Sequence, residues 1–278
     1  MKIITRKQLY ILATLLLLLL VWHVGQRLVI LLPSRQVSVS PADFGVPFEE
    51  LWLDAPAGGG TRPGPVHLWW LPAPKPTAPA VLYLHGNEST LSTDINLILS
   101  LWQAGFAVMA IDYRGYGESA LRLPSETSVY IDARLAWLRF LQLTGKASRR
   151  LLYGHSMGSA VAIDLAGHAQ HLDGLIMDGA FTSAADVGRA MTADWLPLSR
   201  LLRQEFLSAE KIDDLKVPQL FIHCTADEVI PVELGLKLYG LSTAPKQQLL
   251  IEGGDHDHCY QAAPERWRQA VRRMGGLS

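Results

Sequence analysis

The chain has 278 residues, of which 49% are hydrophobic and 18% are charged, and its formal net charge is −1. This length can bury a sizeable core in one main domain, and the balanced charge gives no reason to expect a nucleic-acid partner. The two cysteines, Cys224 and Cys259, are too few for a disulfide scaffold and lack a CxxC spacing. We expect them to be small core residues, with the alternative that they pair in an oxidising compartment.

The first predicted element is an apolar segment within residues 1–32. Three basic residues precede an apolar run over residues 9–24, and extending this run through Gln26 reaches the length of a bilayer span. No A-x-A-like cleavage site follows, so we interpret the segment as an uncleaved signal anchor, with a cleaved signal peptide as the alternative. Only Arg27 and Arg35 follow closely, which predicts a cytoplasmic N-terminus and an exported domain.

Residues 33–47 are predicted to be a linker, because prolines interrupt a polar, serine-rich stretch. A single domain is expected over residues 48–278. It begins with two strand candidates joined by a Gly/Pro-rich turn, and short apolar runs then alternate with longer helical stretches. The strand candidates are residues 48–54, 66–72, 80–85, 106–112, 150–155, 175–179, 218–224 and 247–253.

The clearest helix candidate spans residues 125–145, after Pro124 and with Ser125 as its N-cap. A last helix, PERWRQAVRRM, ends the chain with an apolar stripe on one face. Strands that alternate with helices in this way predict an α/β fold, in which a mostly parallel central sheet of about eight strands is flanked by helices.

The stretch LLYGHSMGSA, residues 151–160, places a serine between two glycines where a predicted strand gives way to a helix. The sequence G-H-S-M-G matches G-x-S-x-G, the nucleophile elbow, in which a sharp turn exposes the serine oxygen. A side chain at Gly154 or Gly158 would collide with the neighbouring strand or helix. If Ser156 were merely a helix cap, these glycines would be unexplained, so we predict that it is a nucleophile.

A serine hydroxyl needs a positioned base before it is a good nucleophile. In hydrolases with this elbow, the acid and then the histidine follow the serine at later strand ends. Asp227 follows the seventh strand candidate and His256 follows the eighth. Asp178, at the end of the sixth strand candidate, is an alternative to Asp227, and His258 is an alternative to His256.

From about residue 48 to its end, the chain resembles the α/β-hydrolase superfamily. The resemblance is to its membrane-anchored, small-lidded serine hydrolases, which include lysophospholipase, monoacylglycerol lipase and depalmitoylase relatives. Besides the elbow, it rests on YLHGN (83–87), DYRGYGES (112–119) and HCTADEVIP (223–231). The chain departs from the usual pattern at Cys224, where the group has glycine, and in GGDHDH, where the group more often has G-x-G-H-N-D.

The resemblance implies that Ser156 attacks an ester or thioester carbonyl to form an acyl-enzyme, while His256 accepts the proton and Asp227 orients the imidazole. It also implies an oxyanion hole made of the backbone N–H groups of Asn87 and Met157. No metal or organic cofactor is implied. The expected substrate is a small or lipid-like acyl ester or thioester.

Residues from about 180 to 217 include an apolar stretch, DWLPLSRLLRQEF, which is expected to form a small lid over the pocket. Two other function classes stay open. A catalytically inactive hydrolase fold could serve as a membrane-tethered binding module. Alternatively, Asp255, His256 and His258 could bind a divalent metal in a metal-dependent hydrolase.

Overall fold

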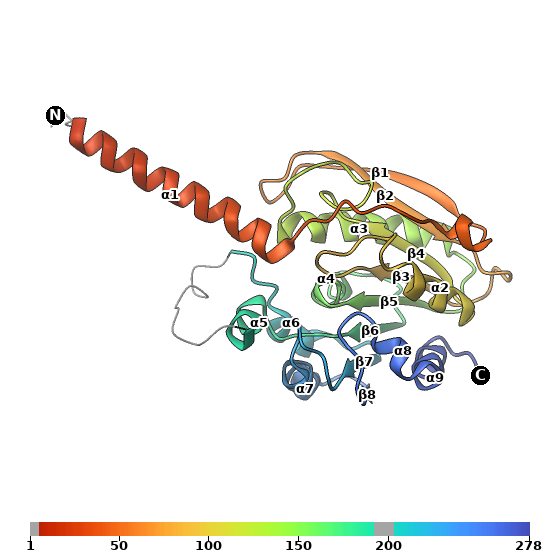
Figure 1. The fold of residues 1–278 in the computed structure, drawn as a ribbon. Helices are drawn as coiled ribbons and strands as arrows, with labels where there is room; N and C mark the ends of the chain where they lie inside the picture. Colours follow the sequence, from red (N-terminus) through yellow and green to blue (C-terminus); the bar gives the residue numbers. More distant parts are fainter. Residues whose placement is uncertain (1–5, 192–202) are drawn as a thin grey trace.

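The computed structural model describes residues 6–191 and 203–278. An eight-stranded sheet with the order β1-β2-β4-β3-β5-β6-β7-β8 forms its centre (Figure 1). The strands are β1 (Glu49–Ala55), β2 (Gly64–Leu71), β3 (Ala80–Leu84), β4 (Ala107–Asp112), β5 (Arg150–His155), β6 (Gly174–Asp178), β7 (Gln219–Cys224) and β8 (Lys246–Ile251). β2 pairs antiparallel with β1 and β4, and every other neighbouring pair is parallel. The predicted mostly parallel sheet is confirmed.

Helices cover both faces of the sheet, which is why its inner strands are buried along their whole length and consist mainly of apolar residues. The helices are α1 (Arg6–Leu31), α2 (Ile95–Gln103), α3 (Glu126–Leu143), α4 (Met157–Ala166), α5 (Ala184–Met191), α6 (Ser208–Lys211), α7 (Val232–Leu241), α8 (Cys259–Ala262) and α9 (Pro264–Met274), with 3-10 turns η1 (Pro41–Phe44) and η3 (Ile212–Asp214). α3, α4 and α7 pack into one core cluster, and α2 and α9 pack into the other.

The predicted start of α3 is confirmed. Ser125 has extended backbone, and its hydroxyl oxygen accepts a hydrogen bond from Ser128 N at 3.2 Å. In return, Ser125 N donates to Ser128 Oγ at 2.8 Å. This reciprocal pair satisfies amides that the first turn of a helix leaves without intrahelical partners.

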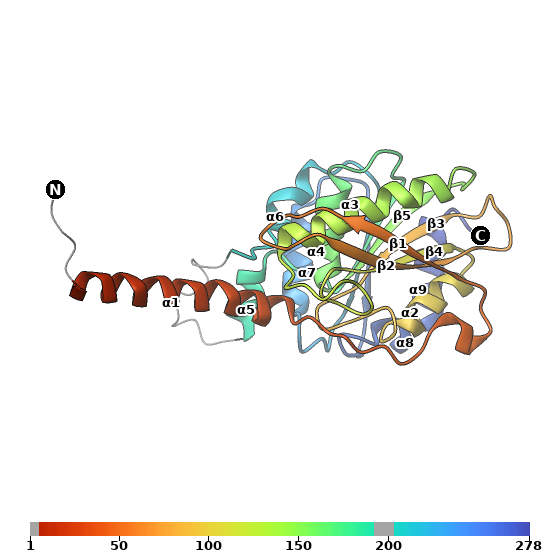
Figure 2. The same cartoon turned by 90° about the horizontal axis from the view of Figure 1, so that it is seen from above.

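α1 projects away from the domain in both views (Figures 1 and 2), and its segment Leu9–Leu31 is long and apolar enough to cross a membrane. Its last turns are different, because they are fastened to the domain. Arg27 is buried, and its Nε donates to the carbonyl of Pro124 at 2.6 Å while its Nη2 donates to Thr61 Oγ1 at 2.9 Å. The apolar helix therefore ends in polar contacts with the domain.

The predicted linker lies along the domain surface. Its backbone N–H groups at Ser38 and Val39 both donate to Ser92 Oγ at 2.8 Å, and Thr90 Oγ1 donates to the carbonyl of Gln36 at 2.7 Å. These bonds hold the chain between the apolar helix and β1 against the loop that precedes α2.

The predicted lid is described only in part, because residues 192–202, which include most of the DWLPLSRLLRQEF stretch, lie outside the described residues. After this gap, Glu126 at the start of α3 accepts hydrogen bonds from Glu205 N at 2.6 Å and Phe206 N at 3.0 Å. The far end of the predicted lid is thus held to the body of the domain.

Candidate active site

Ser156 lies in the turn between β5 and α4, with φ 54° and ψ −123°. A serine with this positive φ is in a strained region that costs about 1–3 kcal/mol and needs support from its surroundings. That support is visible: Ser156 N donates to the carbonyl of Asp178 at 2.8 Å, and Ser159 Oγ donates to the carbonyl of Gly154 at 2.8 Å. The turn is therefore held in the conformation of a nucleophile elbow.

The two glycines of the elbow are required by close backbone packing. A Cβ atom at Gly154 would overlap the carbonyl group of Gly158, and a Cβ at Gly158 would overlap the carbonyl oxygen of Leu84 in β3. Backbone atoms cannot rotate away as a side-chain tip can. The start of α4 consequently lies directly against the sheet, as the sequence pattern predicts.

Replacing Gly158 with alanine is expected to destabilise the protein by about 1–3 kcal/mol or more, because α4 must shift away from β3. Gly240, near the end of α7, is the matched control: an added Cβ there meets open space, so its alanine variant should gain up to about 1 kcal/mol. Thermal unfolding of both variants checks this. A Gly158→Ala variant with an unchanged melting temperature would contradict the packing.

The predicted oxyanion donors, Met157 and Asn87, belong to two different segments of the chain. Met157 is the first residue of α4, so its N–H has no intrahelical partner. Asn87 follows β3 in the loop that contains Gly86, where an added Cβ would lie 3.0 Å from Ser156 Cβ. His85 Nδ1 donates to the carbonyl of Gly86 at 2.7 Å and supports this loop from below. The Met157 amide is thus next to Ser156 in the chain, and the loop that carries Asn87 passes close to Ser156 at Gly86.

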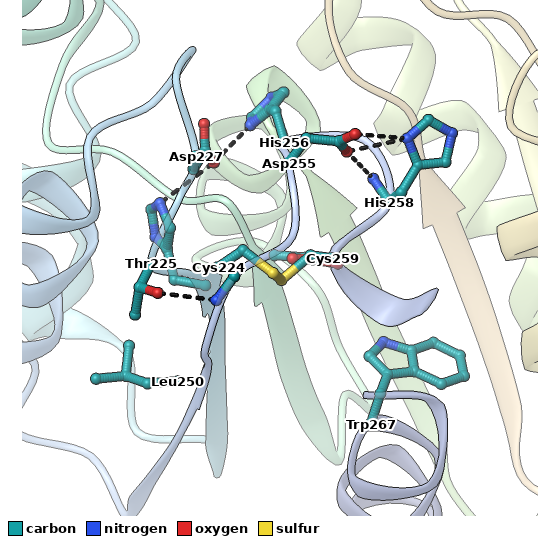
Figure 3. The surroundings of a disulfide bond; sticks show 12 residues. Cys224, Thr225, Asp227, Leu250, Asp255, His256, His258, Cys259 and Trp267 are labelled. Atoms are coloured by element: carbon teal, nitrogen blue, oxygen red, sulfur yellow. Dashed lines mark hydrogen bonds and ion pairs between the residues drawn. A yellow bond between two sulfur atoms is a disulfide. The ribbon is translucent and has the colours of Figure 1, made fainter. Parts of the chain in front are cut away.

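His256 and Asp227 form a pair at the ends of β8 and β7 (Figure 3), with His256 Nδ1 2.7 Å from Asp227 Oδ2. The other carboxylate oxygen accepts from Val229 N at 2.9 Å and from Ile230 N at 2.7 Å. Burial alone would raise the pKa of Asp227, but hydrogen bonds from His223, His256 and Ile230 outweigh it and hold the pKa well below its usual range. The carboxylate is therefore ionised and directed at the imidazole.

The alternative acid and base point elsewhere. Asp178 Oδ2 accepts a hydrogen bond from the Tyr153 hydroxyl at 2.6 Å, and burial raises the pKa of Asp178. His258 is largely exposed, and its Nδ1 lies 2.9 Å from Asp255 Oδ1 (Figure 3). Since Asp255 and His258 bond to each other while His256 faces Asp227, the three residues of the predicted metal alternative do not converge.

Two further histidines brace this pair. His155, which the sequence pattern treats only as a neighbour of the nucleophile, donates from Nε2 to the carbonyl of His256 at 3.1 Å. His223 was assigned no role from the sequence, yet its Nε2 donates to the carbonyl of Ile230 at 2.9 Å and lies 3.4 Å from Asp227 Oδ2. The only signal in the sequence was its position four residues before Asp227.

Cys224 and Cys259 are joined by a disulfide, with Cα atoms 5.5 Å apart (Figure 3). Our main expectation, that the two cysteines are unpaired, is therefore wrong, and the alternative that they pair replaces it. Both cysteines are buried, as expected of core residues. Cys224 ends β7 just before Asp227, and Cys259 begins α8 just after His256. The bond thus links the two loops that carry the histidine and the aspartate.

Replacing both cysteines with alanine is expected to lower the free energy of unfolding by ~3–4 kcal/mol, because the bond closes a loop with a sequence separation of 35 residues. Ester hydrolysis should fall as the two loops loosen. Thermal unfolding with and without a reductant checks this, and the reductant should have no effect on the double variant. Two alkylatable thiols in the unreduced native protein would contradict the bond.

Much of the chain is similar to known proteins. A family model described as serine aminopeptidase, S33, matches residues 75–206, which include Asn87 and Ser156. The uncharacterised protein YfhR of Escherichia coli is 32% identical over 211 residues, covering 72% of this chain and 71% of the relative. The chain belongs to the α/β-hydrolase superfamily. Other α/β hydrolases extend the comparison.

An uncharacterised protein of Mycobacterium tuberculosis is 36% identical over 183 residues, 65% of this chain and 64% of its own length, so the chain spans just under two thirds of that relative. The lysophosphatidylserine lipase ABHD12 of Danio rerio is 30% identical over 196 residues, 64% of this chain and 51% of the lipase. An esterase of Pyrococcus furiosus has the same fold, with a TM-score of 0.68, 21% identity, and coverage of 87% and 95%.

Proposed function

We propose that this α/β hydrolase is a membrane-anchored serine hydrolase that cleaves carboxylic esters or thioesters through an acyl-enzyme. The observation that carries the proposal is the strained elbow of Ser156 at the same sheet edge as the ionised Asp227–His256 pair. Strain of this kind is found where it serves a function. A binding module without activity would need neither the strained serine nor the oriented imidazole.

In the proposed reaction, Ser156 Oγ attacks the substrate carbonyl and His256 Nε2 takes its proton. This nitrogen is buried and has no hydrogen-bond partner among the described residues, so it is available as a base. Asp227 accepts a hydrogen bond from the Nδ1–H group of His256, which sets the tautomer and stabilises the imidazolium. The N–H groups of Asn87 and Met157 stabilise the oxyanion, and losing one such donor typically costs about 10²–10³ in rate. The imidazolium gives the proton taken from Ser156 to the departing alcohol or thiol as the acyl-enzyme forms. Water, activated by the same imidazole, then hydrolyses the acyl-enzyme and releases the acid.

We propose that the membrane supplies the substrate as well as the anchor. Arg27 holds the end of α1 to Thr61 and to the loop after β4, at the edge of the sheet where Ser156 lies. Gly117 N in the same loop donates to the carbonyl of Ser34 at 2.9 Å. A helix fastened there keeps the site beside the bilayer, where lipid-like acyl esters are concentrated. The lipase and esterase names of relatives support this substrate class.

The orientation that we propose has a cytoplasmic N-terminus and an exported catalytic domain. Arg27, near the end of the apolar helix, and Arg35, after it, donate to carbonyl oxygens of the domain, whereas Arg6 and Lys7 before it are exposed. A disulfide also fits an oxidising compartment. Protease added to right-side-out membrane vesicles should digest the domain; digestion only in inverted vesicles would reverse the orientation.

The direct test uses the full chain in detergent micelles. A fluorophosphonate probe should add to the protein once, and peptide mass mapping should place the adduct on Ser156. Hydrolysis of p-nitrophenyl esters and thioesters of increasing acyl length should show an optimum that measures the pocket. A folded chain that neither reacts with the probe nor hydrolyses any ester would favour the binding module instead.

A further inference from the structure

A second group of ionisable side chains lies where β1 and β2 meet the loop after β4, at the antiparallel edge of the sheet (Figure 1). Its centre is His67 in β2, which is 1% exposed. His67 Nδ1 lies 3.1 Å from Asp112 Oδ2. Because a carboxylate oxygen accepts hydrogen bonds, Nδ1 is the donor in this pair, which leaves Nε2 as the ring nitrogen that can bind a ligand.

His67 Nε2 is buried and has no hydrogen-bond partner within residues 6–191 and 203–278. It is directed towards two carboxylates instead. Glu118 Oε2 lies 3.9 Å away, beyond hydrogen-bonding distance, and the ligand atoms of Glu50, His67 and Glu118 all lie within 4.8 Å of one another. Ligand atoms around a tetrahedral ion are ~3.3 Å apart. Small rotations of the two exposed glutamates would bring all three atoms to that spacing.

We propose that His67 Nε2, Glu50 and Glu118 bind a zinc ion, with water in the fourth position. One imidazole nitrogen with two carboxylates is a ligand set that suits zinc, and two negative charges balance the ion. Asp112 would orient the ligand histidine. A metal-binding histidine commonly donates its other N–H to a carboxylate, which fixes the ring and makes it a stronger ligand.

The surroundings of His67 are built to keep the ring in place. Its backbone N–H donates to Ser119 Oγ at 2.7 Å, and the Trp52 ring lies against the imidazole with centroids 4.8 Å apart. Asp112 is itself held, because Leu91 N donates to its Oδ1 at 3.0 Å. The side chains of Glu50 and Glu118 are exposed, so they can rotate toward the ring when the ion enters.

The ion would have a structural role. It would join β1, β2 and the loop that carries Glu118, and this loop holds the chain that leaves the membrane helix, through Gly117 to Ser34 and through Arg35 to Ser119. β1 is an edge strand, so it has a partner on one side only. Zinc would therefore strengthen the attachment between the anchor and the domain without entering the chemistry at Ser156.

The competing hypothesis needs no metal: a protonated His67 could be held between Asp112 and Glu118 as an ion pair. The two hypotheses differ in metal binding rather than in activity. A separate group, His155, His256 and Asp257, could also hold a cation, so the test must tell the two sites apart.

The test uses the full chain in detergent micelles, treated with a chelator and then titrated with zinc alone by calorimetry. Wild type and His256→Gln should each bind one equivalent. Glu50→Gln and Glu118→Gln each lose a direct ligand, so they should bind at least ~100-fold more weakly, which is the upper end of the loss for a merely supporting residue. Zinc should raise the melting temperature of wild type but not of Glu118→Gln. Cobalt in place of zinc should give the visible spectrum of a tetrahedral site in wild type.

Both glutamates are exposed or half-exposed, so their variants should fold and keep full fluorophosphonate labelling, which controls for misfolding. Three results would overturn the proposal. One is that wild type shows no zinc binding with a stoichiometry of one. Another is that Glu118→Gln binds zinc as tightly as wild type does. The third is loss of binding in His256→Gln, which would place the ion at the active site instead.

Discussion

Replacing Ser156 with alanine is expected to lower the turnover of ester substrates by about 10⁴- to 10⁶-fold and to abolish fluorophosphonate labelling. In the proposed mechanism the hydroxyl oxygen is the atom that forms the acyl-enzyme, and alanine offers no replacement for it. Alanine removes one oxygen and leaves the backbone in place, so the fold should be unchanged. Rates measured at saturating ester, with circular dichroism as a check on folding, test this expectation.

Ser159 provides the matched control, since it lies one helical turn away from Ser156. Its hydroxyl donates to the carbonyl groups of Gly154 at 2.8 Å and Asp178 at 3.1 Å and is fully buried. Its alanine variant should lose about 1 kcal/mol of stability and still react with the probe. If labelling survives in Ser156→Ala but disappears in Ser159→Ala, the nucleophile has been misassigned.

Replacing Asp227 with asparagine is expected to lower turnover by about 10³- to 10⁴-fold with a smaller change in KM. The amide can no longer hold the Nδ1 proton of His256 as a carboxylate does, so the imidazole takes the wrong tautomer and its charged form is less stable. The geometry of the loop should persist, because the remaining oxygen can still accept from Val229 N and Ile230 N, as Asp227 Oδ1 does.

Asp178→Asn is the control for that substitution, because both aspartates lie at the ends of neighbouring strands and only one faces His256. The Tyr153 hydroxyl can still donate to an asparagine oxygen, so turnover should change far less than in Asp227→Asn. Turnover and KM should be measured for both variants with one ester across a range of pH. A larger loss in Asp178→Asn would make Asp178 the catalytic acid.

The positions of the strands and of the elbow could be predicted because they depend on neighbouring residues. Each of the eight predicted strands is present, within two residues at each end. Apolar runs of five to eight residues between turn-forming residues are local patterns. The elbow was equally visible, because a serine flanked by two glycines at a strand-to-helix junction is a local pattern too.

The contacts between distant segments could not be predicted in this way. Nothing in the sequence around His223 distinguishes it from any other buried histidine. Only the turn at Ile230 brings it against Asp227. The cysteines showed the same limitation: a sequence separation of 35 residues says nothing about whether two sulfur atoms meet. Each of these contacts depends on how strands are ordered in the sheet.

By itself, the amino-acid sequence determined the α/β class, the apolar N-terminal segment and the residue types available for hydrolysis, because hydrophobic periodicity and turn chemistry act over a few residues. Only the tertiary structure decided which aspartate faces His256, that the cysteines pair, and that Arg27 fastens the apolar helix beside the catalytic edge. These features depend on distances between segments far apart in the chain, and the packing of helices on the sheet sets those distances.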